Sequence, residues 1–171
     1  MKMIAIALLT VAVVGGTLFA GCVGAPLSPF PLPERPPIPT LAIRNVKLCP
    51  FVSEEGEYTV QPGATFDRGD VVWLYFEVPG ITAKGVDGKF EVWGKFCELT
   101  IYDPDGDIIE HLVDPLEFHY TDLDEAPNFH WFYAYYESGA NDAVGQYRFE
   151  FTVKDGLSGA TGTGSATFNL R

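Results

Sequence analysis

Basic and sulfur-containing side chains are scarce in this chain of 171 residues. It has 11 Lys and Arg against 23 Asp and Glu, three His, three Cys and two Met. Nucleic-acid binding needs clustered Lys and Arg that neutralise phosphates, so a formal net charge of −12 argues against nucleic acid as a partner. The same shortage argues against a polybasic contact with a membrane surface.

The sequence also lacks the short motifs of common catalytic and nucleotide-binding sites. It contains no G-x-S-x-G or H-E-x-x-H motif and no phosphate-binding glycine loop. The three histidines, at positions 111, 119 and 130, lie outside any such motif. We therefore expect a protein that is not an enzyme and needs no cofactor.

Only one long hydrophobic run is present, and it lies at the N-terminus. Lys2 precedes the uncharged stretch MIAIALLTVAVVGGTLFA, which a glycine pair interrupts. A membrane-spanning helix needs about 20 apolar residues without strong breakers, so this run is more typical of a cleaved secretory signal. Its end, LFAGC, resembles a prokaryotic lipobox with Phe19 where Leu is usual. The resemblance implies that residues 1–21 are a signal peptide and that Cys22 is lipidated; an ordinary signal peptide or an uncleaved anchor is the alternative.

Residues 22–39 are rich in proline, in the stretch VGAPLSPFPLPERPPIP. Proline removes backbone donors and favours extended polyproline II conformations, so this segment is predicted to be a semi-rigid linker. A proline-rich ligand for a partner groove is the alternative. Removal of residues 1–21 deletes one lysine and no acid, so the mature charge is 10 − 23 = −13. The expected location is the cell membrane or cell surface, with the domain outside the cytoplasm and held by lipid.

Residues 40–171 are long enough for one domain with one core, and their pattern has period two. QYRFEFTV (146–153) alternates apolar and polar residues, as does FCELTIYD (96–103), which places Cys97 on the face of Leu99 and Ile101. VVWLYFEV (71–78) is apolar at nearly every position, which suits a central strand covered on both sides. Turn signals separate these runs and no stretch has a helical period. The fold class is therefore all-β, an antiparallel sandwich of seven or eight strands.

The C-terminal stretch DAVGQYRFEFTVKDGLSGATGTGSATFNL resembles the last two strands of an immunoglobulin-like domain. In that pattern an Asp, a Gly and then a Tyr precede the penultimate strand. The resemblance implies an immunoglobulin-like β-sandwich in which Tyr147 is the corner tyrosine, its phenol hydrogen-bonding back to the turn. Asp142 lies one residue further upstream than usual, and Phe149 stands where antibody domains carry a cysteine. The resemblance bears on the fold, which does not supply a function.

Two cysteines, Cys49 and Cys97, remain once Cys22 is assigned to lipid. Disulfides form and persist in exported domains. We therefore expect a disulfide between Cys49 and Cys97, with two separate buried thiols as the alternative.

The strongest candidate for a metal site is DPDGDIIEHLVD, residues 103–114. Asp103, Asp105 and Asp107 repeat the odd-position oxygen ligands of a calcium loop. Its glycine falls at the fourth position, where an EF-hand needs it at the sixth, and proline with glycine suits a tight turn. The pattern favours a turn joining two strands over calcium binding.

The segment NFHWFYAYYE, residues 128–137, has six aromatic residues in ten positions. On a strand, one face carries Phe129, Trp131, Tyr133 and Tyr135. This face includes the indole of the segment and no histidine. We predict that this face packs inward, so that His130, Phe132 and Tyr136 point outward and form a ligand-binding surface. A strand covered on both faces is the alternative.

The sequence thus predicts a cell-envelope lipoprotein whose β-sandwich is a structural or protein-interaction module. The alternative is a carbohydrate- or peptide-binding domain that uses the aromatic strand 128–137. The expected partners are the membrane, through the N-terminal lipid, and an envelope protein or glycan.

Overall fold

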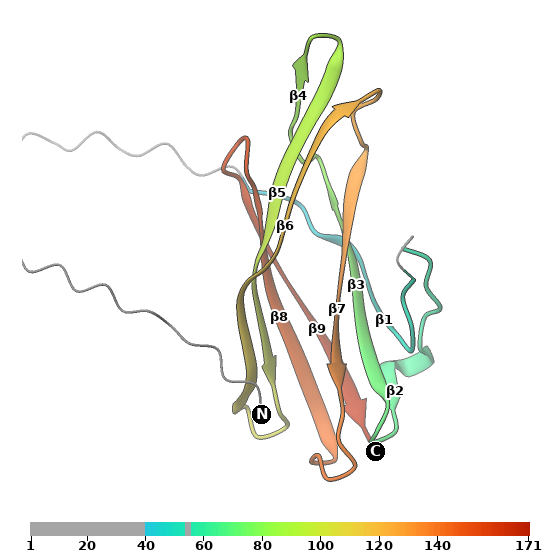
Figure 1. Ribbon diagram of the computed structural model, residues 1–171. Coiled ribbons are helices and arrows are strands. Elements are labelled where there is room, and N and C mark those ends of the chain that lie inside the picture. Colours follow the sequence, from blue (N-terminus) through green and yellow to red (C-terminus); the bar gives the residue numbers. More distant parts are fainter. Residues whose placement is uncertain (1–39, 54–55) are drawn as a thin grey trace, which may run out of the picture. The chain divides into compact units, whose positions relative to one another are not determined.

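The computed structural model describes residues 40–53 and 56–171 (Figure 1). The predicted signal peptide, Cys22 and the proline-rich linker lie outside these residues. The described part of the chain contains one 3-10 helix, η1 (Pro62–Ala64), and these strands: β1 (Arg44–Cys49), β2 (Thr65–Phe66), β3 (Val71–Pro79), β4 (Ala83–Val86), β5 (Lys89–Tyr102), β6 (Ile108–Leu123), β7 (Phe129–Glu137), β8 (Gly145–Asp155) and β9 (Thr161–Leu170). The all-β prediction is confirmed. The described strands number nine rather than seven or eight because the chain adds the short β2 and β4.

The strands form two sheets. The smaller sheet has the order β1-β3-β7, with antiparallel pairing throughout. The larger sheet has the order β2-β9-β8-β5-β4, and β6 also pairs with β5, from Phe90 to Tyr102. The two sheets face each other around one hydrophobic core, which is the arrangement of a β-sandwich.

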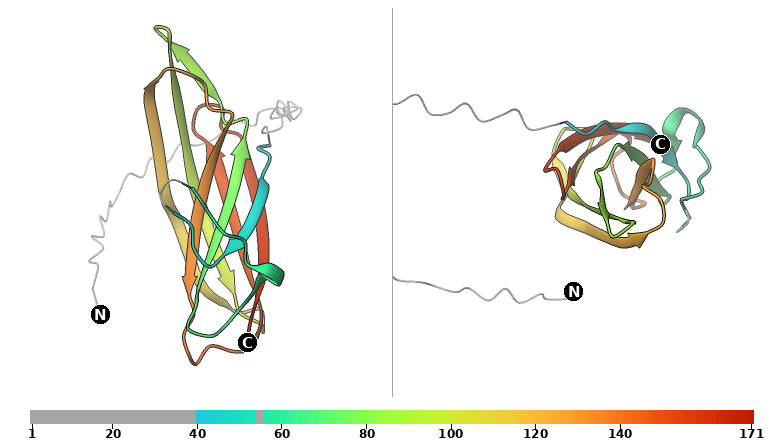
Figure 2. Two further views of the ribbon diagram at one scale, coloured as in Figure 1. Left: turned by 90° about the vertical axis from the view of Figure 1, so that its right-hand side faces the viewer. Right: turned by 90° about the horizontal axis from the view of Figure 1, so that it is seen from above.

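The two sides of the sandwich are closed to different degrees. On one side, Thr40 bridges Thr161 at one end of β9, and β2 pairs with the other end of β9. The chain before and after β1 is therefore attached to the larger sheet. On the other side lie β6 and β7, edge strands of different sheets: among the described strands β6 pairs with β5 alone and β7 with β3 alone. Figure 2 (left) shows β6 and β7 running along the same side of the domain.

The core consists mainly of aromatic side chains from the facing sheets. The ring of Phe76 on β3 stacks on Phe151 of β8 at a centroid distance of 4.1 Å and on Phe132 of β7 at 5.4 Å. The apolar face predicted for residues 146–153 is buried along its whole length. β3 is the central strand of its sheet, as predicted, and its outer residue Tyr75 is also buried.

Tyr147 makes the hydrogen bond expected of a corner tyrosine. Its phenol donates to the carbonyl oxygen of Ala143 at 2.9 Å, and the side chain is buried between β7 and β9 against Tyr136 and Phe168. A short polar link of this kind holds the turn before β8 to the core and satisfies a buried hydroxyl.

Candidate functional site

The aromatic strand β7 has the opposite orientation to the one predicted. Phe132 is 1% exposed and belongs to the core, whereas Tyr133 and Tyr135 are exposed. The cause is the pairing with β3, which sets Phe132 opposite Phe76 and therefore on the same, inward face of the sheet. Because both faces of β7 are aromatic, its own sequence does not distinguish them.

The outward residues of β7 form part of an aromatic surface on the smaller sheet. Trp73 of β3 lies with its ring centroid 4.9 Å from Tyr135 and 5.6 Å from Tyr133. The segment after β1 covers the neighbouring part of this face, where Tyr58 packs on Tyr75 at 4.3 Å. Only a part of the aromatic surface is therefore open to solvent.

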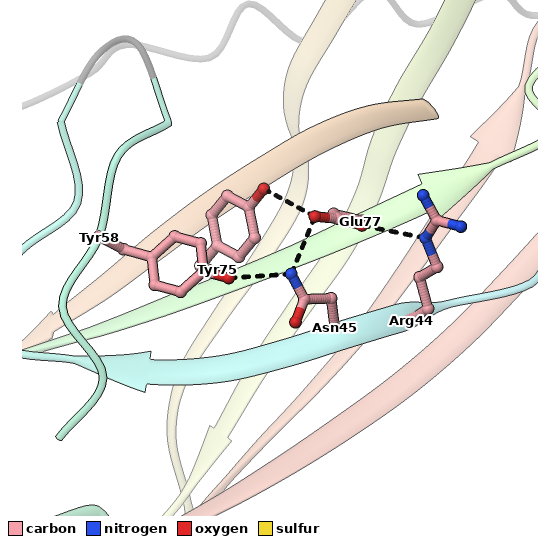
Figure 3. Close-up of polar contacts among 5 residues, drawn as sticks. All are labelled: Arg44, Asn45, Tyr58, Tyr75 and Glu77. Carbon is pink, nitrogen blue, oxygen red and sulfur yellow. Dashed lines mark hydrogen bonds and ion pairs between the residues drawn. The ribbon is translucent and has the colours of Figure 1, made fainter. Parts of the chain in front are cut away.

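A hydrogen-bond network holds that covering segment in place (Figure 3). The carboxylate of Glu77 accepts hydrogen bonds from Arg44 Nε at 2.9 Å, Asn45 Nδ2 at 2.8 Å and the Tyr75 hydroxyl at 3.2 Å. Asn45 Nδ2 also donates to the hydroxyl of Tyr58 at 2.9 Å. Burial opposes ionisation of Glu77, but these hydrogen bonds outweigh it and lower its pKa. The network therefore links β1, β3 and the covering segment through the carboxylate of Glu77 and the amide of Asn45.

A groove of about 860 Å³ opens between β6 and β7. Its floor comes from β5 and its two walls from β6 and β7. The residues that line it are Phe96, Leu99, Glu110, Leu112, Pro115, Leu116, Tyr120 and residues 130–137. The groove therefore occupies the open side of the sandwich, where the two sheets are not joined.

Three apolar side chains of β6 face the core side of the sheet and yet remain exposed. Leu112 is 40% exposed, Leu116 45% and Tyr120 46%. Their pairing partners on β5 are all buried: Leu99, Phe96 and Val92. The smaller sheet ends at β7, which covers β5 and Phe118 of β6 but leaves these three side chains of β6 uncovered.

One end of the groove is aromatic and uncharged. The ring of His130 stacks on Phe118 of β6 at 3.9 Å and lies 5.8 Å from Tyr120 and 4.8 Å from Phe132. Burial among these rings lowers the pKa of His130 to about 4. The imidazole is therefore neutral at physiological pH.

The other end of the groove is acidic. Glu110 and Glu137 line it, and the hydroxyl of Tyr136 donates to Asp142 Oδ2 at 2.6 Å. Burial raises the pKa of Tyr136, and the hydrogen bond to Asp142 and the charge of Glu110 raise it further. The described residues that line the groove include neither Lys nor Arg.

The residues predicted to bind a ligand, His130, Phe132 and Tyr136, all line this groove. They point inward rather than outward, and they form its β7 wall. The sequence reasoning missed the opposite wall, formed by Leu112, Leu116 and Tyr120. Leu116, Phe118 and Tyr120 alternate with polar residues in the sequence, and this alternation predicts a strand. It does not show whether the facing sheet covers that strand.

The structure forms no disulfide between Cys49 and Cys97: both thiols are free, one on β1 of the smaller sheet and the other on β5 of the larger sheet. Cys49 is buried beside Val52 and Tyr75 on the outer side of the smaller sheet. Cys97 lies at a register shift between Phe96 and Glu98, which takes it out of the alternation that the sequence indicates. Burial raises the pKa of both thiols.

The loop 103–107 is the turn between β5 and β6. Asp103 Oδ1 accepts hydrogen bonds from the backbone N–H groups of Asp105 at 3.0 Å and Asp107 at 2.9 Å. Its carboxylate is thus engaged by the loop itself, as in an Asx turn. Within the described ranges, no three His, Cys, Asp or Glu side chains are grouped to hold a metal ion.

Comparison with known proteins adds no family to this description. No protein-family model matches the chain, and no curated protein sequence matches it. In the described part of the chain, no helix has the length and hydropathy needed to cross a membrane.

Proposed function

We propose that this protein is a lipid-anchored, cell-surface lipoprotein whose β-sandwich is a protein-interaction module, with the β6–β7 groove as its binding site. The observation that carries the proposal is the exposure of Leu112, Leu116 and Tyr120 on the core-facing side of β6. Apolar grooves of this size with a few polar groups are the usual binding sites of proteins. Exposed apolar patches on single chains mark interaction surfaces.

The shape of the site favours an extended peptide segment over a small ligand. The groove runs along two strands and is open to solvent on one side, so its occupant can enter laterally. We also propose that the sandwich is immunoglobulin-like, which the hydrogen bond from Tyr147 to Ala143 supports.

A second candidate function is carbohydrate binding on the outer face of the smaller sheet. The observation that favours it is the cluster of Trp73, Tyr133 and Tyr135, of which the two tyrosines are exposed. Aromatic rings that combine apolar area with a polar edge suit sugar binding.

Panning a phage-displayed library of random ten-residue peptides against the mature chain carrying Cys22→Ser tests the protein-interaction proposal. Selected peptides should lose about tenfold in affinity for Leu116→Ser, because a half-exposed leucine that is covered on binding contributes about 1–2 kcal/mol. Val144→Ser is the control, because Val144 is 60% exposed and lies outside the groove. The proposal is wrong if no peptide is selected. It is also wrong if a glycan array shows that the wild type binds a glycan and that Trp73→Ala does not, because the binding site would then be the outer face of the smaller sheet.

The lipid anchor has its own test in the full chain expressed with its signal segment. Replacing Cys22 by Ser should move the protein from the detergent phase to the aqueous phase and remove the lipid increment from its intact mass. A variant that still partitions with detergent would contradict lipidation at Cys22.

A further inference from the structure

The wall of the groove on the β7 side is a free backbone edge. β7 pairs with β3 at nine successive positions without a register shift, and its other edge has no partner among the described strands. Every residue from His130 to Glu137 lines the groove, although their side chains alternate between the two faces of the sheet. The edge of the strand, with its N–H and C=O groups, therefore forms this wall over about 25–30 Å.

The edge of β6 is less suited to pairing. Pro115 lies in β6 and has no N–H to donate, and the preceding Asp114 has a positive φ of 48°. The pairing of β6 with β5 also shifts register three times. Proline and bulges are the features by which proteins protect edge strands from further pairing. β7 contains neither a proline nor a bulge in its pairing with β3, so it is the edge that accepts a strand.

The side chains across the groove define the occupant. A strand beside β7 directs every second side chain inward, where it meets Leu112, Leu116 and Tyr120, so these positions must be apolar. At the acidic end an inward side chain meets Glu110, and Glu137 lies at the same end of β7 on the outward face; no Lys or Arg of the described lining neutralises these two carboxylates. A second copy of the chain has the same net charge of −12, so it has no excess of basic side chains to offer this end.

We infer that the groove binds an extended segment of another protein, which adds as a fourth strand to the edge of β7, turns alternate apolar residues toward β6 and places a Lys or Arg beside Glu110. This inference rests on the proposed function and specifies the partner of the same site. The added strand covers the exposed side chains of β6 and widens the smaller sheet to match the larger one.

Hydrogen exchange with the selected phage peptides tests the mode of binding. With a peptide at about ten times its dissociation constant, alternate amides of β7 should exchange about tenfold more slowly. N-methylation of the peptide at alternate residues should abolish binding for one set of positions and be tolerated for the other, because only one edge of the added strand pairs. Slowed exchange at β6 with none at β7 would overturn the assignment of the edge.

Charge substitutions test the chemistry of the occupant. The selected peptides should be enriched in Lys or Arg at one end. Glu110→Gln should lower their affinity about threefold, and added salt should reduce this difference. Glu125→Gln is the control, because this exposed carboxylate lies in the loop at the opposite end of the groove and does not line it. Groove-dependent peptides without basic residues would refute the inference and leave the proposed function intact.

Sedimentation velocity of the chain without peptide tests whether a second copy of the chain occupies the groove. The chain should remain monomeric. A dimer that Leu116→Ser dissociates would assign the groove to a second copy and overturn the inference.

Discussion

His130 should make the folded domain less stable at mildly acidic pH. Its ring is packed between the two walls of the groove against Phe118, Tyr120 and Phe132. The folded state therefore holds the imidazole in its neutral form, whereas the unfolded chain exposes it to water. Replacing His130 by Phe removes the titrating group and keeps a flat ring in the same aromatic surroundings.

The size of the effect follows from the pKa of His130, which burial lowers from 6.5 to about 4. Between these values the unfolded chain binds a proton that the folded chain does not, so the free energy of unfolding falls as the pH falls. One pKa unit corresponds to about 1.4 kcal/mol. At pH 5 the neutral His130 should lower the free energy of unfolding by about 2 kcal/mol relative to neutral pH. At pH 4 this decrease should approach about 3 kcal/mol.

Urea unfolding of the wild type and of His130→Phe at pH 7.5 and pH 5.0, at equal ionic strength, measures this quantity. The difference in free energy of unfolding between the two proteins should shift by about 2 kcal/mol in favour of the variant at pH 5.0. Any change in packing caused by the phenyl ring is present at both pH values and cancels. The carboxylates whose pKa the fold lowers, such as Asp155, are common to both proteins and cancel too.

Two results would refute this reasoning about His130. The first is an equal pH dependence in the wild type and in His130→Phe, which would mean that the imidazole is solvated or rotated out of the aromatic cluster. The second is an NMR titration of the folded protein in which His130 gains its proton near pH 6.5. His119→Gln, which alters an exposed histidine on the outer face of β6, serves as the control for loss of a histidine.

Three further predictions concern packing, the hydrogen bond of Tyr147 and the thiols. Gly164→Ala should destabilise the domain by about 1–3 kcal/mol in urea unfolding, because the added Cβ would lie 2.4 Å from Cζ of the buried Phe151. Tyr147→Phe should cost about 1 kcal/mol, the net contribution of one hydrogen bond, in the same assay. In alkylation under native conditions Cys97 should react faster than the fully buried Cys49, and both thiols should react after denaturation without reductant.

Matched variants separate these effects from generic ones. Gly85→Ala should change stability by less than about 0.5 kcal/mol, because its added Cβ would meet no atom within 4 Å. Tyr135→Phe alters an exposed tyrosine and should be equally mild. Equal losses of stability for Gly164→Ala and Gly85→Ala would contradict the packing argument. Equal losses for Tyr147→Phe and Tyr135→Phe would contradict the contribution of the hydrogen bond from Tyr147 to Ala143. A domain in which neither thiol reacts after denaturation would contradict the free cysteines.

Features that depend on neighbouring residues in the chain could be predicted from the sequence. The period-two pattern of residues 146–153 places Tyr147, Phe149 and Phe151 on the buried face of β8, as the structure does. The turn at 103–107 follows from proline, glycine and an aspartate that bonds its own backbone. Alternation and turn chemistry are local, so a single strand or loop carries the whole signal.

Features that depend on the pairing and width of the sheets were decided only by the tertiary structure. β7 is aromatic on both faces, so its inward face depends on the register with β3 that places Phe132 opposite Phe76. Cys97 leaves the predicted alternation because of a bulge that arises in pairing. The exposure of Leu112 on β6 follows from a second sheet that ends one strand short. Each of these outcomes depends on how different strands are placed against one another. The periodicity within a single strand does not encode that placement.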